Sequence, residues 1–159
     1  MLFPLEKIQI KPIGFVERTS SEEDEKDRSL TSKIIIEKAL NDALDGITDF
    51  SHIYVIFWMH KIESEKTVLH HPRKADGLPL GVFATRAPIH PNPIGLTLVE
   101  LLRRERNILW VKGLDAYDGT PILDIKPYPD WNHGRWNIIT NFKVPNWLAK
   151  IVGSSNKSH

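Results

Sequence analysis

A proline-rich segment between Phe83 and Thr97, FATRAPIHPNPIGLT, combines a stiff backbone with groups that can bind an anion. Each proline fixes its own φ angle and biases the preceding residue to an extended conformation, so the loop loses little entropy when it closes on a ligand. The prolines are Pro88, Pro91 and Pro93. Arg86 can bind a carboxylate or phosphate through paired hydrogen bonds, and Asn92 offers an amide for recognition. We interpret the segment as a binding loop. The alternatives are a rigid connection between strands and, for Arg86, a structural ion pair.

A short acidic turn, DGTP from Asp118 to Pro121, is the second candidate for a site. By composition alone it is typical of an ordinary β-turn. Asp124 adds a carboxylate nearby, but two acids at this spacing do not by themselves indicate general acid–base catalysis. His60 closes an apolar stretch, and it fits a core histidine and a ligand donor equally well.

Several familiar kinds of site lack the residues they need. His70 and His71 are adjacent, so in an extended chain they point in opposite directions, and no Cys or Glu spacing supports a metal site. The sequence contains neither G-x-S-x-G, G-x-G-x-x-G nor G-x-x-x-x-G-K-[ST], which argues against serine hydrolases and common nucleotide folds. Trp131 and Trp136 lie among polar residues and fit either core positions or platforms for stacking on a base. We expect no metal.

Length and composition predict one cytoplasmic domain. A chain of 159 residues can bury enough surface to fold without a metal or disulfide. Its 21 basic and 20 acidic residues make no general electrostatic case for nucleic acid, although single clusters could contact a polyanion. The absence of cysteine fits a reducing compartment, and no segment has the pattern of a membrane helix or a secretory signal.

Repeated β-forming segments with few helical ones predict a mainly β fold, either a sheet or a barrel. The stretch His52–His60 is almost unbroken in apolar character, which predicts a central strand covered on both faces. Lys61–Gly81 is polar and predicts a long loop. The other predicted strands are Ile8–Glu17, Lys33–Ile36, Leu80–Ala84, Ile94–Arg103, Ile108–Tyr117 and Ile122–Lys126, with a hairpin turn at Arg104–Asn107. Helices are predicted over Glu37–Leu44, ended by Gly46, and over Val144–Val152; we expect a domain of residues 1–152 and a disordered tail of residues 153–159.

Four segments, in order, resemble the signatures of the TrmO family, also called TsaA-like or YaeB-like proteins. They are Ile13–Thr19 (IGFVERT), Asp49–Lys61 (DFSHIYVIFWMHK), Gly81–Leu101 (GVFATRAPIHPNPIGLTLVEL) and Leu114–Tyr128 (LDAYDGTPILDIKPY). The resemblance covers nearly all of residues 8–130. It implies a small single-domain β-barrel with short helices, unlike Rossmann-type methyltransferases, and a homodimer with the site near the subunit boundary. It also implies S-adenosylmethionine-dependent methylation of N6 of the threonylcarbamoyl-adenosine 3′ of the anticodon in tRNA.

The resemblance further assigns positions that contact the cofactor. These are Arg28, His60, Lys61, Arg86, Leu96, Asp118, Gly119, Thr120 and Pro121. Arg28 is the counterpart of an Arg-Gln-Pro-Gly-like stretch of the bacterial enzymes, which EEDEKDRSL replaces in this chain. We expect Arg86 or a neighbouring cation to hold the methionine carboxylate of the cofactor. We assign catalytic roles to His60, which would accept or relay the N6 proton, and to Asp118, which would accept from a cofactor hydroxyl or amine or favour the sulfonium charge.

The substrate implied by the resemblance is an anticodon loop, because the target base must leave its stack to expose N6. Candidate RNA-binding residues are polar groups in predicted loops: Lys61, Arg73, Lys74, Asn92 and Arg135. Longer family members carry a C-terminal extension, whereas this chain ends soon after Trp147. The alternatives are a non-catalytic RNA- or nucleotide-binding module and a methyltransferase with a different small-molecule or RNA substrate.

Overall fold

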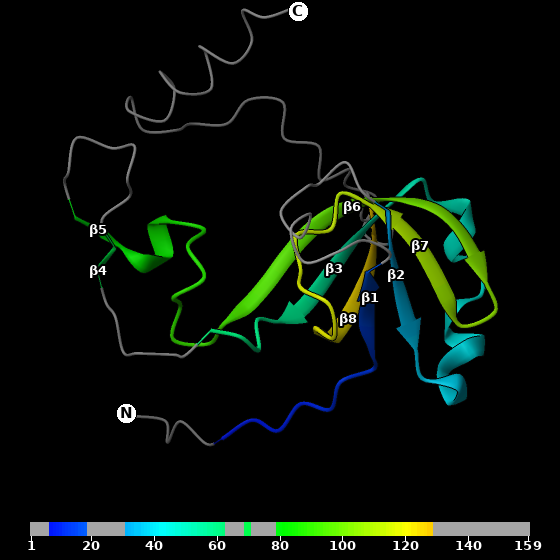
Figure 1. The fold of residues 1–159 in the computed structure, drawn as a ribbon, viewed down its shortest axis with the longest axis horizontal. Coiled ribbons are helices and arrows are strands. Elements are labelled where there is room, and N and C mark those ends of the chain that lie inside the picture. Colours follow the sequence, from blue (N-terminus) through cyan, green and yellow to red (C-terminus); the bar gives the residue numbers. More distant parts are fainter. Residues whose placement is uncertain (1–6, 19–30, 63–68, 71–78, 129–159) are drawn as a thin grey trace, which may run out of the picture.

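The structure of the protein is a computed structural model that describes residues 7–18, 31–62, 69–70 and 79–128. Six antiparallel strands close into a barrel in the order β1-β2-β7-β6-β3-β8 (Figure 1). Their bounds are β1 Gly14–Arg18, β2 Thr31–Ile36, β3 His52–Trp58, β6 Ile94–Glu105, β7 Ile108–Lys112 and β8 Pro121–Tyr128. The predicted β-barrel class is therefore confirmed.

The remaining elements are short and lie outside the barrel wall. The strands β4 (Leu69–His70) and β5 (Leu80–Gly81) form a separate two-stranded sheet, to the left of the barrel in Figure 1. Three 3₁₀ helices complete the described part of the chain: η2 Lys38–Leu44, η3 Ile47–Asp49 and η4 Val82–Ala84. Within these ranges, no helix is long and apolar enough to cross a membrane.

Alternation of side chains along each strand fills the barrel interior. In β3, Ile53, Val55 and Phe57 are buried while their neighbours are only half-buried or exposed, as the period of two requires. Other strands add further β-branched and leucine side chains, which suit a pleated surface. The interior residues contributed by these strands are Val16, Ile34, Ile36, Val99, Leu101, Leu109, Val111 and Ile122.

The structure corrects several predicted boundaries. β3 is covered on its inner face but not on its outer face, because a barrel of this size has one interior. The segment predicted as a helix over Glu37–Leu44 is the 3₁₀ helix η2, which ends before Gly46. Of the strand predicted at Leu80–Ala84, only the first two residues pair, and the rest is η4.

Other strands differ in length from the predictions. β1 begins at Gly14 rather than Ile8, and β6 continues to Glu105, so the hairpin turn is Arg106–Asn107. β7 stops at Lys112, where Gly113 adopts a φ of 94° that breaks the strand. The predicted helix Val144–Val152 and the tail lie outside the described residues, so the domain limits stay predictions.

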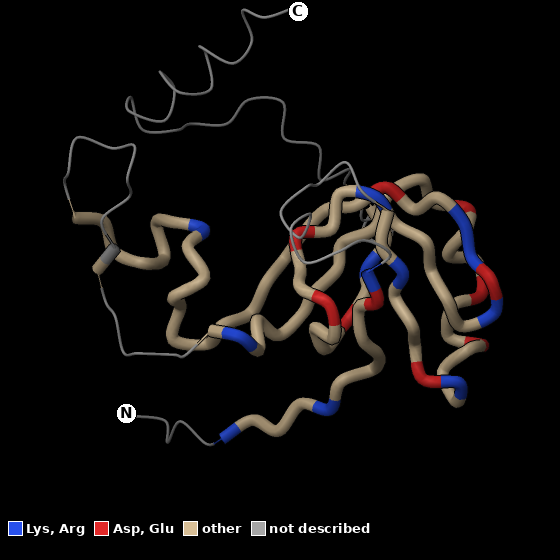
Figure 2. The backbone as a smooth tube through the Cα atoms, in the orientation of Figure 1, with Lys and Arg blue, Asp and Glu red and all other residues tan. Residues whose placement is uncertain are grey.

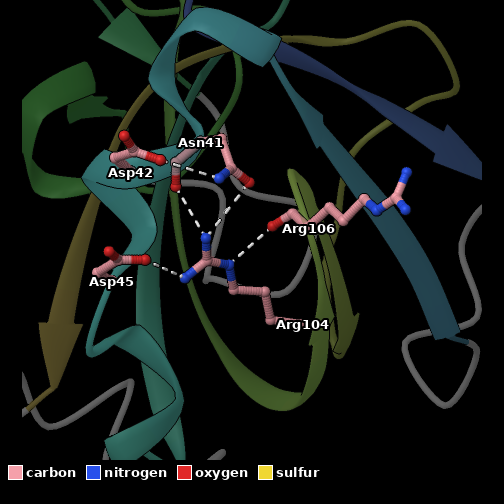
Figure 3. Close-up of polar contacts among 5 residues, drawn as sticks. All are labelled: Asn41, Asp42, Asp45, Arg104 and Arg106. Carbon is pink, nitrogen blue, oxygen red and sulfur yellow. Dashed lines mark hydrogen bonds and ion pairs between the residues drawn. The ribbon is translucent and has the colours of Figure 1, made fainter.

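Arg104 fastens the helix η2 to the far end of β6 (Figure 3). Its guanidinium donates to the carboxylate of Asp45 (2.8 Å) and to the backbone carbonyl of Asn41 (2.9 Å). Its Nε also donates to the carbonyl of Arg106 (2.7 Å), which lies in the hairpin turn at a φ of 56°. One half-buried side chain thus joins the β6–β7 turn to η2, at the opposite end of β6 from Ile94.

Candidate functional site

The end of the barrel near Trp58 is an open mouth to which several chain segments contribute. Trp58 at the end of β3 pairs with Ile94 at the start of β6, and Phe57 pairs with Ile122 near the start of β8. Between Ile56 and Phe57 the β3–β8 register shifts, which leaves Leu123 as an extra residue. Such a bulge locally bends a strand and often lies next to a functional site.

Two adjoining hollows occupy this mouth. The first has a volume of about 410 Å³ and is lined by Phe57, Met59, Lys61, Ile62, Arg86, Pro88, Asp115, Ala116, Tyr117 and Thr120. The second has a volume of about 430 Å³ and is lined by Phe57, Met59, Thr85, Arg86, Ala87, His90, Ile94, Gly95, Leu96, Thr97 and Asp115. Both volumes lie in the range of small-molecule sites.

The proline-rich loop is held in place by its own hydrogen bonds. The hydroxyl of Thr85 donates to the carbonyl of Val82 (2.8 Å) and accepts from the amide of Ala87 (3.3 Å). The ring of His90 is 3.2 Å from the carbonyl of Thr85. At the end of the loop, the amide of Met59 donates to the carbonyl of Pro93 (2.8 Å), which joins the loop to β3. The loop therefore presents a fixed wall to the mouth.

Arg86 lines both hollows. Its guanidinium donates to the backbone carbonyl of Leu96 in β6, and its side chain is exposed. A guanidinium has five N–H donors, so donors remain to bind an anion after this bond is made. Leu96 itself lines the second hollow and is 43% exposed.

The acidic turn contributes Thr120 to the lining of the first hollow, and its polar groups bond to β1. The amide of Thr120 donates to the carbonyl of Tyr117 (3.2 Å), and Gly119 has a φ of 72°, as the third residue of a type II turn requires. Asp118 accepts from the backbone amide of Arg18 (2.8 Å). Thr120 is fully buried and lines the first hollow, while Asp118 is exposed and Pro121 begins β8.

Arg18 holds the segment that precedes the acidic turn, a role that was not predicted from the sequence. Its Nε donates to the carbonyl of Ala116 and its Nη2 to the carbonyl of Leu114, both at 2.9 Å. These bonds fix the segment that carries Asp115, which lines both hollows and was also missed. Arg18 lies in the IGFVERT segment, but its partners are almost 100 residues away, so no local pattern reveals them.

The other predicted site residues are distributed unevenly. Lys61 lines the first hollow, with its Nζ 4.4 Å from the centre of the Tyr117 ring, a favourable cation–π arrangement. His60 is exposed in the turn after β3 and, among the described residues, is not part of either lining. Asn92 is exposed in the proline-rich loop. Arg28, Arg73, Lys74 and Arg135 lie outside the described residues. Within the described ranges, no group of three or more acidic, histidine or cysteine residues could hold a metal ion.

The chain is similar to one protein family model, to several relatives and to solved structures. Residues 20–131 match the family model described as the tRNA-methyltransferase O N-terminal domain. A probable S-adenosyl-L-methionine-binding protein of Methanothermobacter thermautotrophicus is 46% identical over 127 residues, which cover 77% of this chain and 90% of that protein. A tRNA (adenine(37)-N6)-methyltransferase of Mus musculus is 44% identical over 89 residues, which cover 54% of this chain and 20% of that protein.

A crystal structure of TrmO from P. aeruginosa superposes on the protein with a TM-score of 0.68 and 29% identity. The match covers 91% of this chain and 63% of the crystallised chain. This chain therefore spans somewhat less than two thirds of that relative's length, although it spans most of the methanogen protein.

Gly95 is a position where the structure predicts a sharp effect of substitution. A Cβ at Gly95 would overlap the ring of Phe57, its partner on β3 and a residue common to both hollows. We expect Gly95→Ala to displace that ring and to lower the free energy of unfolding by about 1–3 kcal/mol. Urea denaturation measures the change. Gly81→Ala is the matched control, because a Cβ there meets nothing within 4 Å, and equal effects of the two substitutions would contradict the prediction.

Proposed function

The chain belongs to the tRNA-methyltransferase O N-terminal domain family, and from this premise we propose that it is an S-adenosylmethionine-dependent methyltransferase. Its proposed target is N6 of the threonylcarbamoyl-adenosine 3′ of the anticodon in tRNA. The observation that carries the proposal is a convergence in space. Lys61, Arg86 and Thr120 are distant in sequence, each was assigned to the cofactor by the family resemblance, and all three line the first hollow.

The residues of the mouth fit this cofactor chemically. The guanidinium of Arg86 suits the methionine carboxylate, and the buried hydroxyl of Thr120 can exchange a hydrogen bond with a polar group. Phe57, Met59 and Pro88 supply apolar surface in the same lining. We propose that the backbone of Gly119 and Pro121 completes this wall and that Leu96 borders the cofactor from β6.

Methyl transfer requires the protein mainly to position the reactants and to provide suitable charges. S-adenosylmethionine supplies a methyl group already activated on a sulfonium, so the chain needs neither a metal nor a covalent nucleophile. Its residues contribute by orienting the reactants and by a preorganised electrostatic environment. In this scheme the proline-rich loop is a fixed wall, and Asp118 acts through the turn that it holds against β1, in addition to any contact with the cofactor.

Recognition of tRNA is proposed to take place around the same mouth. Lys61 and Asn92 lie beside it, and Arg73, Lys74 and Arg135 are further candidates for contacts with phosphate. Along the backbone of the described barrel, basic and acidic residues are interspersed rather than grouped by sign (Figure 2). Local contacts to a splayed loop therefore suit this surface better than long-range attraction to duplex RNA. We also propose a cytoplasmic location, which a tRNA substrate would fit.

We propose that the protein acts as a homodimer through the outer face of β3 and β6. Cross-strand pairs there are apolar: Trp58 with Ile94, Ile56 with Leu96 and Tyr54 with Leu98. Trp58, Ile94, Leu96 and Leu98 are each between 38% and 43% exposed. A contiguous apolar face of this kind marks an interaction surface, and it continues into the second hollow through Ile94 and Leu96. A second copy of the chain seated here would lie beside the site.

The cofactor assignment predicts a defined loss on removing one charge. Arg86→Ala should weaken binding of S-adenosylmethionine by about 1–3 kcal/mol, because a hydrogen bond to a charged group is lost. Isothermal titration measures the affinity. Arg103→Ala is the control, since Arg103 lies further along β6 and stacks on Trp110, with its guanidinium carbon 4.0 Å from the ring centre. A folded Arg86→Ala protein of unchanged affinity would rule out the assigned role.

The substrate is tested by mass spectrometry of tRNA nucleosides. A strain without the gene should lack N6-methylated threonylcarbamoyl-adenosine, and the purified protein should restore it to that strain's tRNA with S-adenosylmethionine. Unchanged methylation in the strain would remove this substrate. Tight cofactor binding without methyl transfer to any tRNA would instead favour a binding module.

The dimer predicts that a charge on the apolar face separates the subunits. Leu98→Glu should shift the protein from dimer to monomer in analytical ultracentrifugation, because a carboxylate is costly to bury without a partner. Leu102→Glu is the matched control. Leu102 is on the same strand and is 44% exposed, but it lies beyond the residues that pair with β3. A monomeric wild-type protein would overturn the proposal.

A further inference from the structure

Asp115 lies where the two hollows meet. Four residues line both hollows: Phe57, Met59, Arg86 and Asp115. Two of them are apolar and one is a cation. Asp115 therefore carries the one carboxylate among the described residues that line either hollow, and the residue is exposed.

Methyl transfer requires two binding sites that adjoin, and a residue that lines both sites can act on the reacting atoms. The attacking nitrogen and the methyl carbon must lie in line and almost in contact, so the two reactants must meet where their sites adjoin. In the proposed substrate N6 is a ureido nitrogen, whose lone pair is delocalised into both the adenine ring and the carbamoyl carbonyl, so it is a weak nucleophile. As its new bond forms, the nitrogen gains positive charge and its proton becomes strongly acidic. A fixed carboxylate at this point stabilises the developing charge and can take the proton.

We propose that Asp115 is a catalytic residue that contacts the attacking N6 nitrogen and accepts its proton, an inference that rests on the proposed function. The nitrogen lone pair forms the new bond to the methyl carbon, and the electron pair of the broken carbon–sulfur bond stays on sulfur. The N–H proton passes to the Asp115 carboxylate. Because Asp115 is exposed, it then releases the proton to water.

Other groups near the mouth are less well placed for this task. Asp118 is not among the described residues that line either hollow, and its carboxylate accepts the amide of Arg18. His90 lines the second hollow but is not among the described residues of the first, and its Nε2 is 3.2 Å from the carbonyl of Thr85. Arg86 has donors but no acceptor. Asp115 is the group that combines a shared position with the ability to accept a proton.

The first test removes the charge and keeps the shape. Asp115→Asn should lower the single-turnover rate roughly 100- to 10,000-fold at saturating S-adenosylmethionine, the usual contribution of a positioned general base. The RNA is total tRNA purified from the strain that lacks the gene. The control is Asp42→Asn, because Asp42 lies in η2 at the other end of the barrel and should leave the rate within about twofold of wild type.

The second test uses ligand affinities, rather than a reaction rate, to show whether the Asp115 carboxylate lies near the sulfonium. Titration should show that wild-type protein prefers S-adenosylmethionine over S-adenosylhomocysteine, and that Asp115→Asn reduces this preference by roughly fivefold or more. The reason is that a carboxylate close to the sulfonium attracts the cation but not the neutral thioether. A residue that only supports the fold would change both affinities together.

The outcomes separate this inference from the proposed function. A wild-type rate, or a wild-type preference between the two ligands, in folded Asp115→Asn overturns the role of Asp115 while leaving the methyltransferase intact. If Asp115→Asn fails to fold, Asp115→Ser is measured in the same way, and failure of both to fold makes the carboxylate structural and overturns the inference. If the wild-type protein binds the cofactor but methylates no tRNA, the proposed function itself fails.

Discussion

The closure of the barrel between β1 and β8 is the constraint on which the rest of the structure depends. The register joins these strands at two positions, Gly14 with Ile122 and Phe15 with Pro121, whereas β3 and β6 pair at seven. Past Phe15, β1 continues along the acidic turn instead: Val16 exchanges backbone hydrogen bonds with Gly119 and Thr120, at 2.8 and 2.9 Å. The turn thus substitutes for a strand. The hydrogen bonds that close the barrel also build one wall of the mouth.

Because the acidic turn both closes the barrel and borders the mouth, two carboxylates only three residues apart have different surroundings. Asp118 faces β1, where it accepts the amide of Arg18 and satisfies a donor at the end of the strand. Asp115 precedes the turn, on a segment whose carbonyls at Leu114 and Ala116 are held by the Arg18 side chain. Those bonds hold the backbone on both sides of Asp115, a residue that lines both hollows.

Strands were predicted correctly where many consecutive residues share β-forming character, so that no single residue determines the result. The segments that begin at His52 and at Ile94 have strong β character, and they form β3 and β6 of the barrel. Exact ends were harder, because Gly113 breaks β7 through its own backbone conformation and Leu123 is a bulge that depends on the partner strand. The roles of Arg18 and Asp115 could not be predicted, since each depends on segments brought together only by closure of the barrel.

The proposed cofactor does not require the glycine-rich motifs that bind phosphate. Those motifs use backbone amides at helix N-termini to neutralise phosphate. S-adenosylmethionine carries no phosphate; its charges are a carboxylate, an ammonium and a sulfonium. On the proposed function, a protein needs one fixed cation and one fixed anion on neighbouring walls, separated by apolar surface. Arg86 and Asp115 can supply these two charges, and Phe57 and Met59 supply apolar surface in the same shared lining.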